Sequence, residues 1–359
     1  MNDFRRRFVT GGAAGAALAC LNACAGPLAM ISTAKVPAPR LDQLFARTKL
    51  MCFGRYAVEL PEETEQIMGF QQIAGGFKQF ALSDYREPRF LLQQEWDKVA
   101  RDDRDAQILT PISDGPVRGS KYMWFYDMDY ARRAGLRVLR GAVAVGSTIY
   151  LYRGMTIPRE GISADTLFER MSTLMRGMHA WDGTSVPREP GVCIDGAFIH
   201  EPTHRFQEIM SSGFVFPSLP DVHFSVMSNK NASTEGDNGK GLLQRVDEAR
   251  REQVFYPYTM LRSGPRVLHG LWDGEEVLAR RGDGALQFNW ELVGERGNVA
   301  RPPWLEVSFR TRVADNKVGA ALYSAISDEQ AVALWDRLLE NLKFRVAVPG
   351  ATAQSVALG

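Results

Sequence analysis

The sequence has few of the residue types that most often carry chemistry. It contains 4 cysteines and 5 histidines in 359 residues. It has no P-loop, no G-x-G-x-x-G fingerprint and no G-x-S-x-G nucleophile elbow, so nucleotide binding and α/β-type serine hydrolysis lack support. The Asp237-Asn-Gly turn lacks the later ligands of a calcium loop. We therefore expect no cofactor, no metal and no catalytic residue, and a protein that is not an enzyme.

An excess of either charge is also missing. Lys and Arg total 43, and Asp and Glu total 42. Proteins that bind nucleic acids or other polyanions concentrate positive charge. We therefore expect no nucleic-acid partner.

Long hydrophobic runs are absent, because no stretch of 18 or more apolar residues follows the start of the chain. No membrane-spanning helix is therefore expected. At the start, Arg5–Arg7 precede a small, apolar run at Gly11–Leu21, which is typical of an export signal. We assign residues 1–23 to this signal. Arg5–Val9 also approximates the twin-arginine address, so the twin-arginine and general export routes both remain open.

Cys24 follows Leu21-Asn22-Ala23, the order of a lipoprotein cleavage site whose cysteine is acylated. Each buried methylene of an acyl chain contributes about 0.8 kcal/mol to membrane binding, so Cys24 is expected to hold the protein at a membrane surface. Residues 24–47 then form the anchor and an Ala- and Pro-rich tether. A soluble secreted protein cut nearby is the alternative. Both alternatives place the protein in the periplasm.

Two segments of the chain share a spacing. Cys52–Pro61 and Cys193–Pro202 each run from a cysteine to a proline nine residues later, with a glycine soon after the cysteine. This repeated spacing divides the chain into residues 48–182 and 190–346, and the segment between them is rich in Pro and Gly. In an oxidising compartment, Cys52 and Cys193 either form a disulfide between the halves or remain two small buried residues.

Each half ends in an amphipathic helix, the first beginning near Ser163 and the second near Ser327. Both serines suit an N-cap, and Gln330 completes a capping box in the second. Strands and one middle helix precede each terminal helix without regular β-α alternation. This order predicts an α+β fold of two related domains, each an antiparallel sheet with helices packed on one face. Residues 347–359 are expected to form a flexible tail.

One segment, His200–His204, reads His-Glu-Pro-Thr-His and matches the H-E-x-x-H pattern of zinc proteases. That chemistry needs both histidines one helical turn apart on one face. Pro202 opposes a helix at this place, and the corresponding segment Glu59–Glu63 has no histidine. We therefore expect a proline that ends a strand, and no zinc site.

Aromatic residues supply the candidates for partner binding. Tyr122–Tyr126 alternates as a strand with large residues on both faces. Tyr and Trp are among the residues that dominate the energetics of interfaces, so Tyr122, Trp124 and Tyr126 are candidates. A central strand covered on both faces is the alternative. Asn229 and Lys230, which open a polar loop, are further candidates.

The strands Cys52–Pro61 and Pro190–Ile199 resemble those that open the two domains in a known family, the immunity proteins paired with phospholipase effectors of the bacterial type VI secretion system. The resemblance covers residues 48–346. It implies a non-enzymatic envelope protein that uses both domains to grip a toxic lipase delivered into the periplasm. The implied partner is the cognate phospholipase effector, and the implied mechanism is steric occlusion.

Two other classes of protein remain open from the sequence. A lipid-anchored periplasmic enzyme, such as a hydrolase, is expected to have a polar pocket that holds a strongly perturbed acid or base. An envelope assembly lipoprotein is expected to bind cell-wall or secretion components and not to inhibit a lipase.

Overall fold

The computed structural model describes residues 40–74, 76–233, 239–252 and 258–359, and these residues belong to one compact unit. The expected export signal and Cys24 lie outside them. Within the described residues, no helix has the length and apolar character that crossing a membrane requires.

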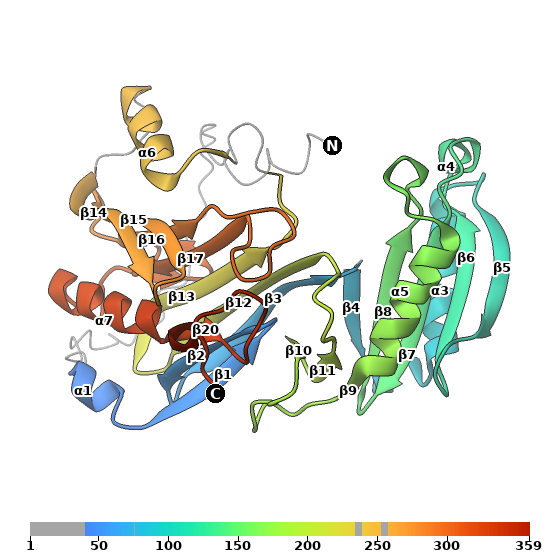
Figure 1. Cartoon of the computed structure of the whole chain (residues 1–359), viewed down its shortest axis with the longest axis horizontal. Coiled ribbons are helices and arrows are strands. Elements are labelled where there is room, and N and C mark those ends of the chain that lie inside the picture. Colours follow the sequence, from blue (N-terminus) through green and yellow to red (C-terminus); the bar gives the residue numbers. More distant parts are fainter. Residues whose placement is uncertain (1–39, 75, 234–238, 253–257) are drawn as a thin grey trace, which may run out of the picture. The chain divides into compact units, whose positions relative to one another are not determined.

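A 12-stranded antiparallel sheet connects most of the fold, in the order β14-β15-β16-β17-β13-β12-β3-β4-β8-β7-β6-β5 (Figure 1). The α+β class with antiparallel sheets is therefore confirmed. The strands are β3 (Glu65–Ile73), β4 (Gly76–Ala81), β5 (Gln107–Asp114), β6 (Lys121–Tyr126), β7 (Val138–Val145), β8 (Thr148–Met155), β12 (Glu208–Phe216), β13 (Leu219–Asn229), β14 (Tyr258–Leu268), β15 (Trp272–Arg281), β16 (Leu286–Leu292) and β17 (Trp304–Arg310).

The sheet consists of two parts that meet, among the residues the structure describes, at the pair of Gln72 of β3 with Gly76 of β4. Strands from β14 to β3 form a seven-stranded part, and strands from β4 to β5 form a five-stranded part. Among the described residues, short elements lie in the segments outside the sheet: α1 (Leu41–Leu44), α2 (Leu82–Tyr85), α4 (Asp129–Arg133), β18 (Val313–Ala314), β19 (Lys317–Val318) and the 3-10 turns Pro158–Glu160 and Ala353–Ser355.

Helices cover both faces of the five-stranded part. Tyr150 packs in the cluster formed with α5 (Ala164–Gly177), whereas its neighbour Leu151 packs in the cluster formed with α3 (Pro88–Asp102). Consecutive strand residues point to opposite faces, so the two helices lie on opposite sides of these strands. The expected arrangement had helices on one face only.

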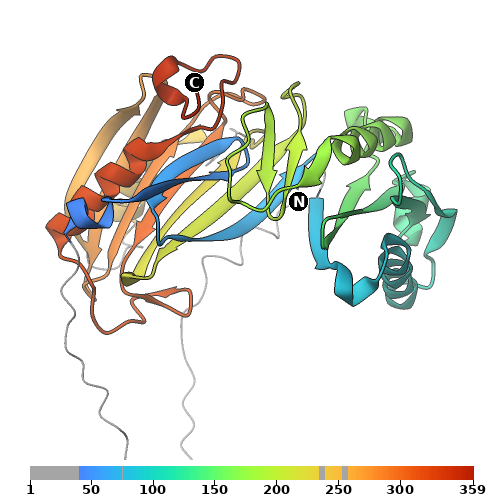
Figure 2. The same cartoon turned by 90° about the horizontal axis from the view of Figure 1, so that it is seen from below.

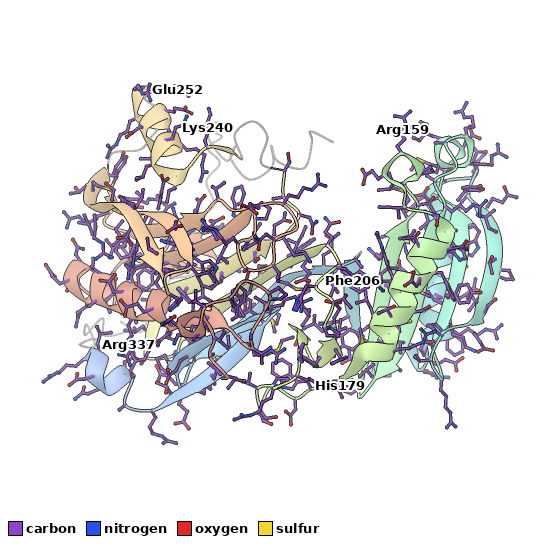
Figure 3. The ribbon with its side chains drawn as sticks, in the orientation of Figure 1. Arg159, His179, Phe206, Lys240, Glu252 and Arg337 are labelled. Atoms are coloured by element: carbon purple, nitrogen blue, oxygen red, sulfur yellow. A yellow bond between two sulfur atoms is a disulfide. The ribbon has the colours of Figure 1, made fainter. Side chains whose placement is uncertain are left out.

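The seven-stranded part buries its inner face under α7 (Asp328–Asn341). Trp335 of α7 is fully buried, with its ring 6.1 Å from that of Phe288 and 6.5 Å from that of Phe309. Full burial of a large apolar side chain contributes about 1.5–3 kcal/mol. The capping box expected at Ser327 is present. Helix α6 (Leu242–Arg251) packs near β15, and Lys240 and Glu252 mark its two ends (Figure 3).

Two small three-stranded sheets join the halves crosswise. The hairpin of β1 (Thr48–Phe53) and β2 (Tyr56–Pro61) pairs with β20 (Leu342–Phe344), the strand directly after α7. The hairpin of β10 (Gly191–Ile194) and β11 (Ala197–His200) pairs with β9 (Met178–Ala180), the strand directly after α5. Figure 2 shows the blue β1–β2 hairpin beside the red α7 helix. Each opening hairpin therefore pairs with the strand that ends the other half.

The hydrophobic cores follow this crosswise pairing. Tyr56 of β2 stacks on Phe344 of β20 at 5.2 Å between ring centroids. Ile194 and Ile199 of the second hairpin lie in the same cluster as Met171 of α5. The ranges 48–182 and 190–346 stay a prediction, and the clusters around Tyr56 and Met171 contain residues from both.

Residues 347–359, expected to be a flexible tail, are held against the fold. The backbone N–H groups of Ala357 and Leu358 donate to the carbonyls of Phe344 (2.8 Å) and Arg345 (3.0 Å). Val348 and Ser355 are buried. These bonds extend the crosswise sheet at β20, and the local sequence has no periodicity that reveals them.

Candidate partner-binding site

The two crosswise hairpins meet at Cys52 and Cys193. The structure contains a disulfide between them, with the Cα atoms 6.1 Å apart, inside the range that such a bond requires. Gly54 and Cys193 also exchange two backbone hydrogen bonds of 2.8 Å each. Gly54 has a φ of 54°, a left-handed conformation that glycine adopts without strain. The hairpins are therefore joined both covalently and by backbone pairing.

A buried ion cluster lies beside this junction. Arg55, in the turn of the first hairpin, donates to both carboxylate oxygens of Glu208, from Nε to Oε2 at 2.8 Å and from Nη2 to Oε1 at 2.7 Å. Arg55 also donates to the Glu201 carboxylate, and Lys230 Nζ lies 3.4 Å from Glu208 Oε1. All four side chains are buried. Removal of one member of such a cluster leaves an uncompensated buried charge, so the cluster fixes the first hairpin against the start of β12 and the end of β13.

Electrostatics keep Arg55 and Glu201 charged. Burial lowers the pKa of Arg55, but the Glu208 and Glu201 carboxylates more than offset it, and the pKa is raised. Burial raises the pKa of Glu201, but the Thr203 hydrogen bond and the Arg55 charge overcome it, and the pKa is lowered. Burial lowers the pKa of Lys230, against the pull of Glu208. The opposite charges therefore stabilise one another in place of water.

The H-E-x-x-H segment supplies part of this cluster. His200 is the exposed last residue of β11, and His204 has a left-handed φ of 53°. Glu201 accepts hydrogen bonds of 3.0 Å from the backbone N–H groups of Thr203 and His204. The segment is thus a strand end followed by a turn, as Pro202 predicts, and Glu201 is bound to Arg55. Among the described residues, no group of three or more His, Cys, Asp or Glu could hold a metal ion.

The turn of the second hairpin lies between β3 and β4. Asp195 donates its backbone N–H to Gln71 Oε1 of β3 at 2.9 Å. Its carbonyl accepts from Gln79 Nε2 of β4 at 2.8 Å and from the Tyr150 hydroxyl at 2.7 Å. The turn therefore binds both strands and occupies the place where β3 and β4 diverge.

A cleft of about 980 Å³ opens beside this turn. Its walls come from β3, from the β7–β8 turn, from the segment after β9 and from the Asp195 turn; the lining residues are Gln66, Ile67, Met68, Val145, Gly146, Ser147, Thr148, Ala180, Trp181, Asp182, Gly183, Ser185, Asp195 and Gly196. His179, on β9 near this wall, packs against Phe198 of β11 (Figure 3). Among the described lining residues, Asp182 and Asp195 alone are charged, so this lining is negative.

Large apolar side chains are exposed on β3 next to the cleft. Ile67 is 56% exposed and Phe70 is 54% exposed. Exposed apolar side chains beside a cleft with polar walls are typical of binding surfaces. A preformed, negatively charged cleft with an apolar margin is suited to a protein partner.

The residues proposed from sequence lie elsewhere. Trp124 is buried in the α5 cluster, Tyr122 packs edge-on against Phe168 at 4.9 Å, and Tyr126 is half-buried at the end of β6. These three thus belong to a strand covered on both faces, the alternative interpretation. Asn229 ends β13 and accepts from the Asn231 N–H at 3.1 Å. Lys230 is a buried member of the ion cluster.

The sequence interpretation missed Arg55 and the cleft. Arg55 is one of two charged residues, with Glu59, inside the largely apolar Cys52–Pro61 segment, and this was the available signal. The cleft is lined by four separate segments of chain, so no local pattern marks it.

The protein is an α+β protein built from two crosswise-linked halves, with a cleft beside the Asp195 turn. Residues 185–347 match the family model described as the Tle cognate immunity protein 4 C-terminal domain, and the resemblance to immunity proteins of type VI secretion phospholipase effectors is thereby confirmed. This family is one of immunity proteins, in agreement with the expectation of a non-enzymatic protein. No curated protein was found to match the chain.

Solved structures match over most of the chain. The apo immunity protein TplEi of the type VI secretion system of Pseudomonas aeruginosa is 22% identical, covering 83% of this chain and 97% of its own, with a TM-score of 0.62. The same protein complexed with a peptide called "L" is 22% identical, covering 83% and 98%, with a TM-score of 0.61. The matched chain of the Tle4–Tli4 complex is 23% identical, covering 83% of this chain and 97% of its own, with a TM-score of 0.62. These matches show that the fold is shared.

Proposed function

We propose that this protein is an immunity protein that binds and neutralises a phospholipase effector of the type VI secretion system. The observation that carries the proposal is the match of residues 185–347 to the Tle cognate immunity protein 4 family. One structure with the same fold is a complex of such an immunity protein, Tli4, with Tle4. The partner we propose here is the corresponding effector of this chain.

The proposed mechanism is steric occlusion. Both parts of the sheet contribute to the cleft between β3 and the β7–β8 turn, so a segment of effector that enters it contacts both halves. The disulfide and the Arg55 cluster hold the walls in place before binding. Preorganisation of this kind lowers the entropic cost of association and supports the tight binding that self-protection requires.

The proposed compartment is the periplasm. The Cys52–Cys193 disulfide is typical of an oxidising environment, and the export signal and Cys24 predicted from the sequence agree with it. We propose that acylated Cys24 holds the protein at the envelope membrane. Cys24→Ser is expected to abolish acylation and release the protein from the membrane fraction; membrane association that survives this change would refute the anchor.

The test of the function is protection from the toxin. A lipase encoded beside the gene of this protein is expressed with a periplasmic export signal, with and without the full chain. We expect growth to be restored, lipase activity to fall in a phospholipase assay, and the two proteins to co-purify. If there is neither protection nor a complex, the immunity function is wrong, and the envelope assembly interpretation gains support.

A further inference from the structure

One edge of β3 has no strand partner along most of its length. Among the described residues, the edge facing β4 is paired at Gln72–Gly76 alone. The opposite edge is paired with β12 in four consecutive register pairs from Glu65–Val215 to Met68–Ser212, before an irregularity near Gly69 and Phe70. The stretch Glu65–Met68 is therefore regular β-strand with one edge open.

The cleft runs along this open edge. Three consecutive residues, Gln66, Ile67 and Met68, line it. Because consecutive strand side chains point to opposite faces, a cavity that touches all three contacts the backbone edge between them. Gln66 is held in place, since its Nε2 donates to the Cys52 carbonyl at 3.1 Å and to Ser212 Oγ at 2.9 Å. The unpaired backbone groups thus lie on a fixed strand.

The two terminal edges of the same sheet are protected against pairing. The terminal strand β14 contains Pro265, and two arginines, Arg262 and Arg266, lie near it in the same strand. The opposite terminal strand, β5, carries Pro111, and its pairing with β6 is irregular at two places. Proline, charge and irregular pairing are the devices by which proteins keep edge strands from associating.

The open edge of β3 has little of this protection, because it carries no proline and one charged residue, Glu65. The run Gln66–Ile73 contains no proline and no charged residue, and it exposes Ile67 and Phe70. An exposed, apolar edge of this kind is a template for a further strand. Addition of an extended segment to a sheet edge is a common mode of protein recognition, in which main-chain hydrogen bonds supply affinity.

We infer that the open edge of β3 binds an extended segment of the effector by strand addition at Glu65–Met68, an inference that rests on the proposed function. The charged lining residues Asp182 and Asp195 favour a segment that carries Lys or Arg. A second copy of this chain is a poorer occupant, because its own Glu65 and cleft would add negative charge to a negative site. The segment enters the cleft that opens beside the Asp195 turn.

The test measures binding of the purified neighbouring lipase to the full chain and to three variants. Ile67→Lys places a charge on the open edge, and Val267→Lys does the same on β14, where Val267 is also 56% exposed. We expect Ile67→Lys to weaken binding about tenfold or more and Val267→Lys to leave it unchanged. Ile67→Thr, which keeps strand propensity, is expected to weaken binding less. Thermal unfolding checks that all three variants fold.

A second readout concerns the backbone. On binding of the lipase, alternate amides within Glu65–Met68 of the unsubstituted chain are expected to gain protection from hydrogen exchange, because only one edge receives the new strand. Binding that leaves these amides unprotected, or that Ile67→Lys does not weaken, overturns strand addition while the immunity function stands. Absence of any binding by the unsubstituted chain overturns the function itself. A dimer of this chain that Ile67→Lys abolishes, with lipase binding intact, overturns the effector as occupant.

Discussion

The two halves follow the same order of elements but differ at one hairpin. In the second half, β12 and β13 pair from Ile209–Asn229 to Phe216–Leu219. In the first half, the described residues of the corresponding strands β3 and β4 pair only at Gln72–Gly76. One half therefore has a closed sheet at this place and the other an open edge beside a cleft. A repeated architecture has kept its framework and changed one pairing, and that change creates the candidate site.

The turns of the two crosswise hairpins also differ, in the kind of contact that holds each turn. The first turn inserts Arg55 into a cluster with Glu201 and Glu208. The second turn inserts Asp195 between β3 and β4, where its backbone is bound by Gln71, Gln79 and Tyr150. One junction is thus ionic and buried, and the other consists of neutral hydrogen bonds at the edge of the cleft. The comparison predicts unequal costs when each is broken.

The largest effect is expected at the ionic turn. Arg55→Met leaves Glu201 and Glu208 buried without their main partner, so the free energy of unfolding should fall by about 3–5 kcal/mol. Arg47→Met is the matched control, because the Arg47–Glu62 pair is exposed and such pairs contribute about 0–1 kcal/mol. Urea unfolding measures both. Equal losses would mean that burial of the cluster has no energetic consequence.

The disulfide ranks next. It closes a loop with a sequence separation of 141 residues, and removal of a native disulfide typically costs about 2–5 kcal/mol. The double variant Cys52→Ala/Cys193→Ala should unfold at lower urea than the oxidised protein. Reducing agent should destabilise the unsubstituted chain and leave the double variant unchanged. If the reductant destabilises the unsubstituted chain and the double variant equally, loss of the Cys52–Cys193 disulfide does not explain the destabilisation.

A smaller loss is expected at the neutral turn. Tyr150→Phe removes one of the two side-chain hydrogen bonds to the Asp195 carbonyl, which should lower the free energy of unfolding by about 0.5–1.5 kcal/mol. Tyr130→Phe is the control, since Tyr130 is 66% exposed. Hydrogen exchange in β4 should also quicken in Tyr150→Phe alone. A loss as large as that of Arg55→Met would contradict the distinction between the turns.

The smallest effect is a pH dependence. The pKa of Glu201 is below its ordinary value of 4.5, because the Thr203 hydrogen bond and the Arg55 charge outweigh burial. Its contribution to stability is therefore present above pH 4.5 and lost as the pH falls through the lowered value. Glu201→Gln should flatten the decline in stability measured by urea unfolding below pH 4.5; an unchanged slope would assign the acid sensitivity to other groups.

Elements with strong local signals were predictable from the sequence. The terminal helices begin after Ser163 and Ser327, as their capping patterns indicate. Pro202 stands outside a helix, so the zinc-protease pattern at His200–His204 forms no helical face. The shared spacing of Cys52–Pro61 and Cys193–Pro202 indicated two equivalent hairpins. In each case the determining interactions lie within a few residues of one another.

The candidate site was much less predictable. Tyr122 and Trp124 were chosen for their residue type, but the packing of α5 on their face of β6 covers them. The sequence placed Lys230 in a polar loop. In the structure its side chain is buried and donates to Glu208, which lies 22 residues away in the sequence. Residue type indicates what can bind, and only packing decides what is exposed.

The sequence by itself determined the α+β class, the repeated hairpins and helices, and the two equivalent cysteines, because hydrophobic periodicity, caps and turns act over a few neighbouring residues. The tertiary structure decided that each hairpin completes the other half, that Arg55 is buried, and that β3 keeps an open edge. Those outcomes depend on which of several similar strands pair with one another. Strand pairing is set by packing between residues more than a hundred positions apart, such as Tyr56 with Phe344.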